Sequence, residues 1–586
     1  MTRPEARDRD WWKEAAIYEI YPRSFNDSDG DGVGDLAGIA GKLDYLDDLG
    51  IDAVWLTPVY DSPLGDFGYD IRDYRQILDD YGTMDDWERV RDGLHERDIR
   101  LVMDLVANHT SDEHEWFQQS RREVDPYTDY YIWRESDDGP PNNWESLFGG
   151  PAWTYDEVRG EYYLHLFDEK QPDLNWRNPA VREDIYEVMR WWLEKDVDGF
   201  RMDVINLLSK PEGLPDGEPS EVVTGSEHFI NGPNLGEYLR EMHDRVLSAY
   251  DVVTVGEMPG ASVDDARTYA GSDGPLDMVF HFEHMRLDST GNQDPWDFQD
   301  WKLSDLKETF TRWQEGLYPD SWNALYLNNH DQPRQVSRFG DDEEYREESA
   351  TLLCTFLHTL RGTPFVYQGE EIGMTNVPFE DVDEIRDVEA IRYVERMLER
   401  DDVENFDDIS EAVMYGSRDN ARTPVQWSTD ENGGFTTGDP WLKVNPNHPE
   451  INVETARGNP GSIWEYYRRL IELRKAHPVL VYGRYELLAG DHPRIYAYER
   501  IGDGEQVSDS GPDSDDEGSG DGQWDDERAL VVLNFSGDRA EFEPADYVDA
   551  DGDDARLLVA NYDVPRPVAL DHSTWQPYEA RVYLLD

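Results

Sequence analysis

Short apolar runs recur along the chain, and amphipathic segments separate them. The runs lie at residues 15–22, 52–59, 100–109, 198–205, 251–257, 276–284, 324–331 and 363–371. Segments between them, such as "DDWERVRDGLHERD" (85–98) and "VREDIYEVMRWWLEKD" (181–196), have the apolar spacing of helices. Eight strands alternating with helices predict an α/β protein built on a (β/α)8 TIM barrel. An open doubly wound sheet is the alternative, but such a sheet rarely needs eight strands of this kind.

The spacing between runs breaks once, between His109 and about Asn175, in a segment rich in Trp, Tyr, Pro and Gly. This segment is too long for an ordinary loop. We therefore predict a small inserted domain at 109–175, between two parts of the barrel at 1–108 and 176–488. From 489 to 586, runs such as "RIYAYERI" and "RALVVLNFS" predict an antiparallel β-sandwich. Within it, the acidic stretch 503–527, which lacks Lys and Arg, predicts a solvated, disordered insertion.

The chain is strongly acidic, because 129 Asp and Glu against 54 Lys and Arg give a formal net charge of −75. A polyanion of this kind repels nucleic acids and anionic membranes, so neither is an expected partner. Disorder would require few aromatic residues, whereas these make up 12% of the chain. A folded, halophilic protein fits better, because 1 M salt screens self-repulsion beyond about 3 Å.

Few features of the sequence bear on location and assembly. Cys354 is the only cysteine, so an intrachain disulfide cannot form. The N-terminal segment lacks the apolar core of a signal peptide, and no run is long and apolar enough to span a membrane. We therefore expect a soluble, cytoplasmic protein, present as a monomer or a weak homo-oligomer.

Polar clusters stand at the ends of several predicted strands: Asp104, Asn108 and His109; Arg201 and Asp203; Glu257; His330 and Asp331. In a barrel all these strand ends face one C-terminal cup. Packing alone explains them poorly, since each buried ion costs several kcal/mol to desolvate. Retaining glycosidases need a carboxylate nucleophile and a carboxylic acid about 5–5.5 Å apart, and the many aromatic rings suit the faces of sugars. A metal site on the two histidines is the alternative, although no HExxH-like spacing occurs.

Five segments, taken in order, carry a resemblance to a known family: "DLVANHTSDEHEWF", "DGFRMDVIN", "TVGEMPG", "NNHDQPR" and "QGEEIGMTN". They resemble the signature regions of the α-amylase family, glycoside hydrolase family 13, and most closely its oligo-1,6-glucosidase branch. Similarity in "YYIWR", "EYYLHLFDEKQPDLNW" and "RDNARTPVQW" extends the resemblance from about Trp11 into the C-terminal domain. The acidic stretch at 503–527 departs from the family pattern.

The resemblance implies roles for individual residues. Asp203 would be the nucleophile, and Arg201 beside it would lower its pKa and keep it ionised. Glu257 would be the general acid/base, and Asp331 would stabilise the transition state. The remaining substrate-binding residues would be Asp66 and Arg422, a pair that closes the −1 pocket, with Tyr69, His109, Phe167, Gln171 and His330. Such a closed pocket would make the enzyme exo-acting, releasing one glucose from the non-reducing end.

Linkage preference is expected to depend on Val204, the residue after the nucleophile. Within the family's α-glucosidases, Val at this position goes with α-1,6 linkages and Ala or Thr with α-1,4. One or two methyl groups discriminate by only ~1–3 kcal/mol, and Val204 could simply fill a strand. An α-1,4-glucosidase, a trehalose-6-phosphate hydrolase and a sucrose isomerase or transglucosylase remain alternatives. A non-catalytic binding protein is disfavoured, because all three carboxylates are present.

The stretch "DSDGDGVGDL" (27–36) alternates aspartates with glycines, like a calcium-binding loop. It is not an EF-hand, because Gly38 stands where Glu would be required. The resemblance implies a structural Ca²⁺ held by four aspartates and the carbonyl of Val33: Asp27, Asp29, Asp31 and Asp35. A plain turn in an acidic protein is the alternative, and Mg²⁺ in place of Ca²⁺ is left open. No organic cofactor is expected, and the expected partner is a small oligosaccharide substrate.

Overall fold

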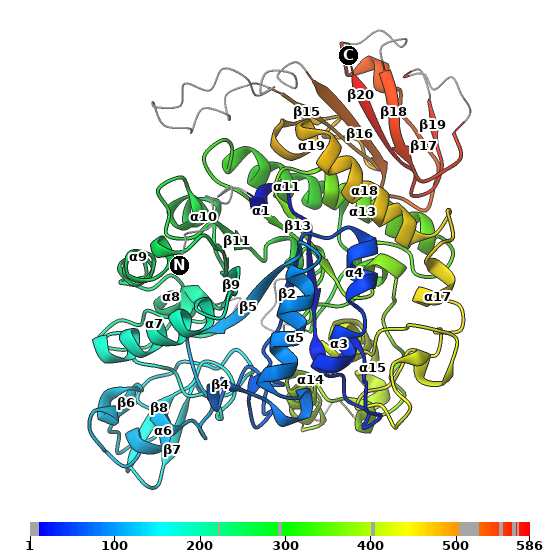
Figure 1. Ribbon diagram of the computed structural model, residues 1–586. Helices are drawn as coiled ribbons and strands as arrows, with labels where there is room; N and C mark the ends of the chain where they lie inside the picture. The colour runs from blue at the N-terminus through cyan, green and yellow to red at the C-terminus, as the bar shows by residue number, and fades with distance from the viewer. Residues whose placement is uncertain are drawn as a thin grey trace.

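Eight parallel strands form the centre of the computed structural model (Figure 1), which describes residues 11–220, 223–290, 296–399, 403, 405–502, 527–549, 555–564, 570 and 573–585. The strands are β1 (Ile17–Ile20), β2 (Ala53–Leu56), β5 (Arg100–Val106), β9 (Gly199–Asp203), β10 (Val253–Glu257), β11 (Met278–Phe280), β12 (Ala324–Leu325) and β13 (Thr363–Tyr367). They follow one another around the sheet in chain order, and a parallel bridge between Val279 and Asn323 joins the last gap. The predicted barrel is confirmed.

Most residues of these strands are apolar, because side chains fill the inside of the barrel and the outer face of the sheet is covered as well. An outer ring of helices supplies that cover: α4 (Leu43–Leu49), α5 (Met84–His95), α7 (Pro179–Leu193), α9 (Leu235–Arg245), α10 (Val263–Ala270), α11 (Leu303–Gly316), α13 (Arg346–Thr359) and α18 (Ile463–Ala476). In α7, buried Val181, Ile185, Met189 and Trp192 recur at helical spacing. Among the described residues, no helix combines the length and the apolar character needed to cross a bilayer.

The predicted insertion follows β5. It contains α6 (Glu115–Ser120) and a three-stranded antiparallel sheet of β6 (Trp133–Arg134), β8 (Glu161–Leu164) and β7 (Trp153–Asp156). A short hairpin, β3 (Tyr60–Asp61) and β4 (Asp73–Ile77), follows β2. Its loop contains Asp66 and Tyr69, so the insertion and the hairpin both supply residues on the C-terminal side of the barrel.

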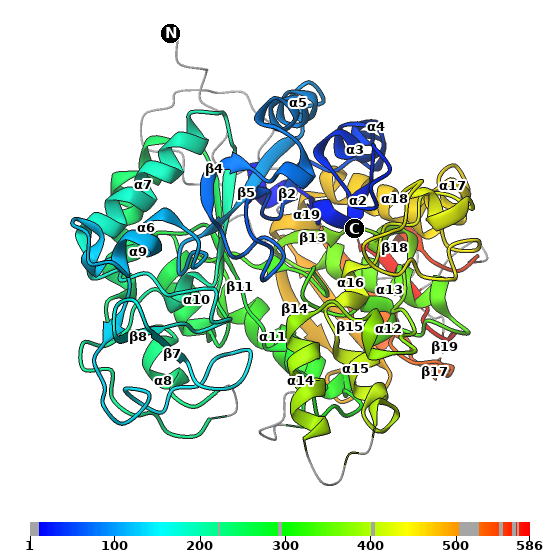
Figure 2. The same cartoon turned by 90° about the horizontal axis from the view of Figure 1, so that it is seen from below.

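A second long excursion, residues 368–462, follows the last of the eight runs and separates β13 from α18, and the spacing of the runs did not predict it. It holds α14 (Val388–Leu398), α15 (Ser410–Gly416), α16 (Asp419–Arg422) and α17 (Val453–Ala456), and part of it packs around its own apolar cluster, which includes Phe379 and Tyr393. Its helices have the same periodicity as those of the barrel, so the hydrophobic pattern did not mark it. Figure 2 shows α14 and α15 across the molecule from α8 (Ser226–Phe229) and β7.

The C-terminal part is an antiparallel sheet of β14 (Arg484–Leu488), β15 (Ile495–Ile501), β16 (Arg528–Asn534), β20 (Ala580–Leu585) and β18 (Ala555–Ala560). A second pair, β17 (Ala540–Glu541) and β19 (Thr574–Trp575), shares an apolar core with it that includes Val532, Phe542 and Trp575. Figure 1 places this sheet at the opposite end of the molecule from β6–β8. Of the predicted acidic insertion at 503–527, all but Glu527 lies outside the described residues.

Candidate active site

The catalytic candidates stand at the C-terminal ends of barrel strands. Asp203 ends β9, Glu257 ends β10, Asp331 follows β12 and His109 follows β5. All four are therefore carried to the same mouth of the barrel, the side on which barrel enzymes bind their substrates. The backbone of the sheet, rather than a flexible loop, positions the first two.

Arg201 is the centre of the site. Its side chain is 1% exposed, and its Nη1 lies 2.9 Å from Oδ1 of Asp203 and 3.0 Å from Oδ1 of Asp104. Its Nη2 lies 2.7 Å from Oε2 of Glu257. One guanidinium thus holds two catalytic candidates beside each other. Because three carboxylates share this single cation, the site favours additional positive charge between them.

The prediction that Arg201 keeps the pKa of Asp203 low does not hold for the net shift. Burial raises the pKa of Asp203 well above its usual range, and Arg201 only opposes this rise. Desolvation by burial is the main cause of the raised pKa, and Glu257 and Asp104 add to it because they place negative charge next to Asp203. A developing positive charge on a substrate would stabilise the ionised form of Asp203.

Val204 has an unusual backbone for a β-branched residue. It lies directly after β9 with φ of 35° and ψ of 43°, in the left-handed region. Such a conformation costs roughly 1–3 kcal/mol and is found mostly at functional sites. It directs the N–H of Val204 to Oε2 of Glu257 at 2.9 Å. The side chain belongs to an apolar cluster with Leu166 and Phe229 and is not part of the strand.

Asp331 is partly exposed and surrounded by cations. Arg422 donates to its Oδ1, Nη1 of Arg418 lies 3.5 Å from the same oxygen, and Nε2 of His330 lies 3.2 Å from Oδ2. Burial alone would raise the pKa of this carboxyl, but His330, Arg422 and Arg418 together hold it well below its usual range. Asp331 is therefore ionised at all ordinary pH values.

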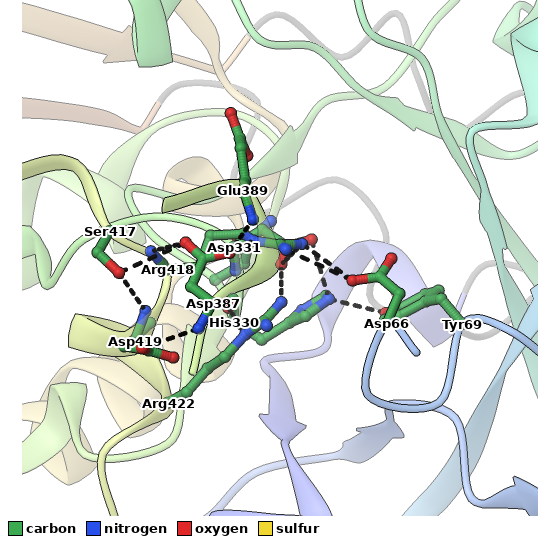
Figure 3. A network of polar contacts seen from close by, with 12 residues as sticks. Asp66, Tyr69, His330, Asp331, Asp387, Glu389, Ser417, Arg418, Asp419 and Arg422 are labelled. Atoms are coloured by element: carbon green, nitrogen blue, oxygen red, sulfur yellow. Dashed lines mark hydrogen bonds and ion pairs between the residues drawn. The ribbon is translucent and has the colours of Figure 1, made fainter. Parts of the chain in front are cut away.

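The predicted pairing of Asp66 with Arg422 was wrong. Asp66 pairs with Arg418, whose Nη1 and Nη2 both lie 3.4 Å from its Oδ1, whereas Arg422 pairs with Asp331 (Figure 3). Arg418 also contacts Oδ1 of Asp387 at 2.7 Å. It therefore ties the loop after β2 to the second excursion. Arg418 begins the segment "RDNARTPVQW", but no local feature of the sequence distinguishes it from Arg422.

Gln171 and Phe167, both from the inserted domain, lie beside His109. Nε2 of Gln171 lies 3.2 Å from Oδ2 of Asp66 and 3.3 Å from Nε2 of His109. The ring of Phe167 lies 5.1 Å from that of His109. Burial lowers the pKa of His109 to about 4, so this imidazole is neutral. A neutral imidazole can donate or accept a hydrogen bond with a sugar hydroxyl.

A cavity of about 630 Å³ lies at the mouth of the barrel, and its lining includes Pro259, two residues after Glu257, and Gln332, the residue after Asp331. Its walls come from the inserted domain, the loops after β9, β10, β11 and β12, and α14; they include Phe148, Phe282, Glu389 and Arg396. This volume falls within the range of pockets that hold small organic ligands. The cavity is therefore large enough for more than one sugar ring.

The aspartate-rich loop gathers part of its predicted ligand set. Carboxylate oxygens of Asp27, Asp29 and Asp35 lie within 4.8 Å of one another, as hard-oxygen ligands of a divalent cation would. Asp31 is not in this group, and its exposed Oδ1 accepts the N–H of Val33 at 2.8 Å. The donor set fits a Ca²⁺ ion, with three of the four predicted aspartates.

Glu19 is a site residue that sequence reasoning missed altogether. It lies in β1 at 1% exposure and its Oε1 is 2.6 Å from Nδ1 of His330. The only available signal was a lone charge in the apolar run "AAIYEIYP". The sequence alone could not show whether this charge has a structural or a functional role, because its partner, His330, is more than 300 residues away in the chain.

A TIM barrel whose strand ends present paired carboxylates around a buried arginine, beside a cavity of sugar size, defines a glycoside hydrolase. The comparisons agree: the model of the α-amylase catalytic domain matches residues 19–483. The chain belongs to the α-amylase family of glycoside hydrolases.

Relatives within the family differ in their reactions. The chain is 53% identical to an oligo-1,6-glucosidase of Parageobacillus thermoglucosidasius, over 98% of this chain and 99% of the relative. It is 46% identical to a trehalose-6-phosphate hydrolase of Bacillus subtilis, over 98% of both chains. Among solved structures, an isomaltulose synthase of Klebsiella sp. LX3 matches with a TM-score of 0.89 and 41% identity, covering 100% of both chains.

Proposed function

We propose that this protein is a retaining, exo-acting α-glucosidase that prefers α-1,6-linked, isomaltose-type substrates and works in high salt. The oligo-1,6-glucosidase is 53% identical to it and the trehalose-6-phosphate hydrolase 46%, which supports hydrolysis of unphosphorylated glucosides. The observation that carries the proposal is the grouping of Asp203 and Glu257 on one guanidinium, with Asp331 following β12 at the same end of the barrel.

In the proposed reaction, Asp203 attacks the anomeric carbon while Glu257 donates a proton to the glycosidic oxygen. The bond to the leaving sugar breaks, and a covalent glucosyl-enzyme forms. Glu257 then removes a proton from water, which attacks the same carbon and releases glucose with retained configuration. The excess of carboxylates over cations around Arg201 would stabilise the positive charge of both transition states.

Exo action is supported by ion pairs that join loops at the mouth of the barrel. Asp66, Arg418 and Asp387 link the loop after β2 to the second excursion, and Arg422 links that excursion to Asp331. These links leave the cavity of about 630 Å³ as the space for the leaving group. A substrate would therefore enter with its non-reducing end first.

Linkage preference is assigned to Val204. Its strained backbone contacts Glu257, and its side chain packs against the inserted domain, so its size can set the position of the wall near the leaving sugar. In Val204→Ala we expect the ratio of kcat/KM for isomaltose over maltose to fall by about 10-fold.

The test is initial rates on isomaltose, maltose, trehalose 6-phosphate and sucrose, in molar KCl, for the wild-type enzyme and Val204→Ala. Fastest release of glucose from isomaltose supports the proposal. A faster initial rate on maltose or trehalose 6-phosphate contradicts the substrate assignment, as does isomerisation of sucrose without net hydrolysis. Neither result contradicts the roles proposed for the three carboxylates. Glu257→Gln, assayed on the same panel, controls for contaminating glucosidases.

We also assign a structural Ca²⁺ to Asp27, Asp29 and Asp35, with no part in the chemistry. Asp35 caps α3 (Leu36–Ala40) by accepting the N–H of Gly38, and Asp27 accepts the hydroxyl of Thr436 from the second excursion. A cation here would neutralise three neighbouring carboxylates and fix this contact between distant segments.

A further inference from the structure

Glu19 is a buried carboxylate at the catalytic mouth that the proposed reaction does not use. Its Oε1 accepts hydrogen bonds from Nδ1 of His330 at 2.6 Å and from the backbone N–H of His330 at 3.3 Å. β13 separates β1 from β12 in the sheet, so this contact joins non-neighbouring strands. Two hydrogen bonds to one histidine fix both its backbone and its ring.

Two tyrosine rings lie beside the ring of His330, with their planes nearly parallel to it. The ring centroids of Tyr69 and Tyr21 lie 5.4 Å and 6.0 Å from it, at interplanar angles of 5° and 12°. Its Nε2 lies 2.8 Å from the hydroxyl of Tyr69 and 3.2 Å from Oδ2 of Asp331 (Figure 3). The orientation of this imidazole is therefore determined by β1, the loop after β2 and the end of β12 together.

A chain of hydrogen bonds continues from Tyr69 to the catalytic centre. The Tyr69 hydroxyl donates to Oδ2 of Asp104 at 3.0 Å, and Asp104 accepts from Arg201, the cation that holds the two catalytic carboxylates. If Nε2 of His330 carries a proton, it donates to Tyr69 and leaves the hydroxyl free to donate to Asp104. If Nε2 is bare, Tyr69 must donate to it instead, and Asp104 loses a donor.

Charge favours the doubly protonated ring. Burial by itself lowers the pKa of His330, but Asp331 and Glu19 outweigh burial and raise that pKa to about 9. The other charged or titratable groups that face these two side chains are Arg422, Arg201, Asp104, Tyr21, Tyr69 and Tyr367.

We propose that Glu19 is a positioning residue that holds His330 as an oriented imidazolium, so that Nε2–H donates towards Tyr69, Asp331 and the bound sugar. This assignment rests on the proposed function for the sugar, but the state of His330 can be measured without any substrate. Glu19 acts only through His330 and touches neither the reacting atoms nor the substrate.

The direct test is NMR of the full-length protein labelled with ¹³C at Cε1 of histidine, with the His330 resonance identified from His330→Gln. We expect His330 to titrate above about pH 8 in the wild type, and its midpoint to fall by about 1–3 pH units in Glu19→Gln, which keeps an acceptor oxygen but removes the charge. Glu371→Gln, another buried carboxylate that accepts from β1 through Tyr18, is the matched control and leaves the midpoint in place.

An unchanged midpoint in Glu19→Gln overturns the proposal. If Glu19→Gln does not fold, the titration of His330 in the wild type is the test. A His330 that is neutral at pH 7 in the wild type also overturns the proposal. Glu19→Asp keeps the charge, so the midpoint of the His330 titration should lie close to that of the wild type.

Kinetics give an independent readout. At pH 8, Glu19→Gln and His330→Gln should each lose about 10- to 100-fold in kcat/KM on an α-glucoside, the usual cost of removing a group that orients a site histidine. The double variant should lose no more than His330→Gln, whereas additive losses contradict the proposal. If the wild type hydrolyses no α-glucoside, the proposed function is wrong. The NMR titration still tests whether Glu19 keeps His330 protonated.

Discussion

At the scale of single residues, Arg201 explains why charged groups interrupt an apolar strand. A buried cation with no partner would be strongly destabilising. Here its guanidinium contacts Asp104, Asp203 and Glu257, each within 3.0 Å. The ion pair predicted from two neighbouring positions of one strand is therefore a network that joins three strands.

Glu257→Gln removes the proton donor and keeps the shape of the side chain. We expect kcat on isomaltose to fall at least about 10²–10⁴-fold, the range for loss of general acid–base catalysis. Thermal unfolding should change little, because Gln can still accept the N–H of Val204. Turnover within a few-fold of the wild type would refute the acid/base assignment, and azide rescue with an activated substrate would support it.

Glu370 provides a test of pH dependence. It is 2% exposed, and burial raises its pKa to about 8. Between these two pKa values the folded protein holds a proton that the unfolded chain has released near pH 4–5. The stabilisation from Glu370 is therefore lost as the pH rises from about 4–5 to about 8, and it does not change further above pH 8. Glu370→Gln does not titrate, so its Tm relative to the wild type should rise between pH 5 and pH 8.

The matched control is Glu411→Gln on the exposed face of α15. It should leave the pH dependence of Tm unaltered. A Tm difference between Glu370→Gln and the wild type that is flat with pH would show that Glu370 is not protonated in the folded state.

At the scale of elements, the second excursion completes the site. α16 and the residue before it supply both arginines that hold Asp331, and the cap of α14, Asp387, holds Arg418. The inserted domain faces this excursion across the cavity and supplies Phe167 and Gln171. Two excursions from the barrel, and not one, therefore build the substrate pocket.

The aspartate loop also connects elements, and calcium should strengthen that connection. We expect Tm to rise with Ca²⁺, since a ligand at 100 times its Kd adds about 2.7 kcal/mol to the free energy of unfolding. Asp29→Asn should abolish the rise. Asp31→Asn, in the same loop but outside the cluster, is the matched control and should keep it. Equal effects of the two variants would return Asp31 to the ligand set.

At the scale of the whole molecule, the net charge of −75 dominates. Self-repulsion of that size destabilises a compact state at low ionic strength, and salt screens it. We expect Tm to rise between about 0.1 M and 2 M KCl by more than in sucrose of equal osmolality. A Tm that responds equally to KCl and to sucrose would contradict the halophilic interpretation.

The sequence by itself determined the barrel and the gathering of its strand-end carboxylates at one mouth. Eight apolar runs specify strands buried on both faces, and the direction of parallel strands carries every strand end to one mouth, so the grouping of Asp203, Glu257 and Asp331 needed only the chain order. The residues at strand ends were therefore predictable from local pattern.

Only the tertiary structure decided which charges pair. Asp66 pairs with Arg418 and not with Arg422, four residues on, and Glu19 pairs with His330 from a strand that is not adjacent. Partners of this kind lie hundreds of residues apart, and no periodicity of the chain encodes the distance between them. Local pattern places a charge in an element, but packing of the whole molecule selects its partner.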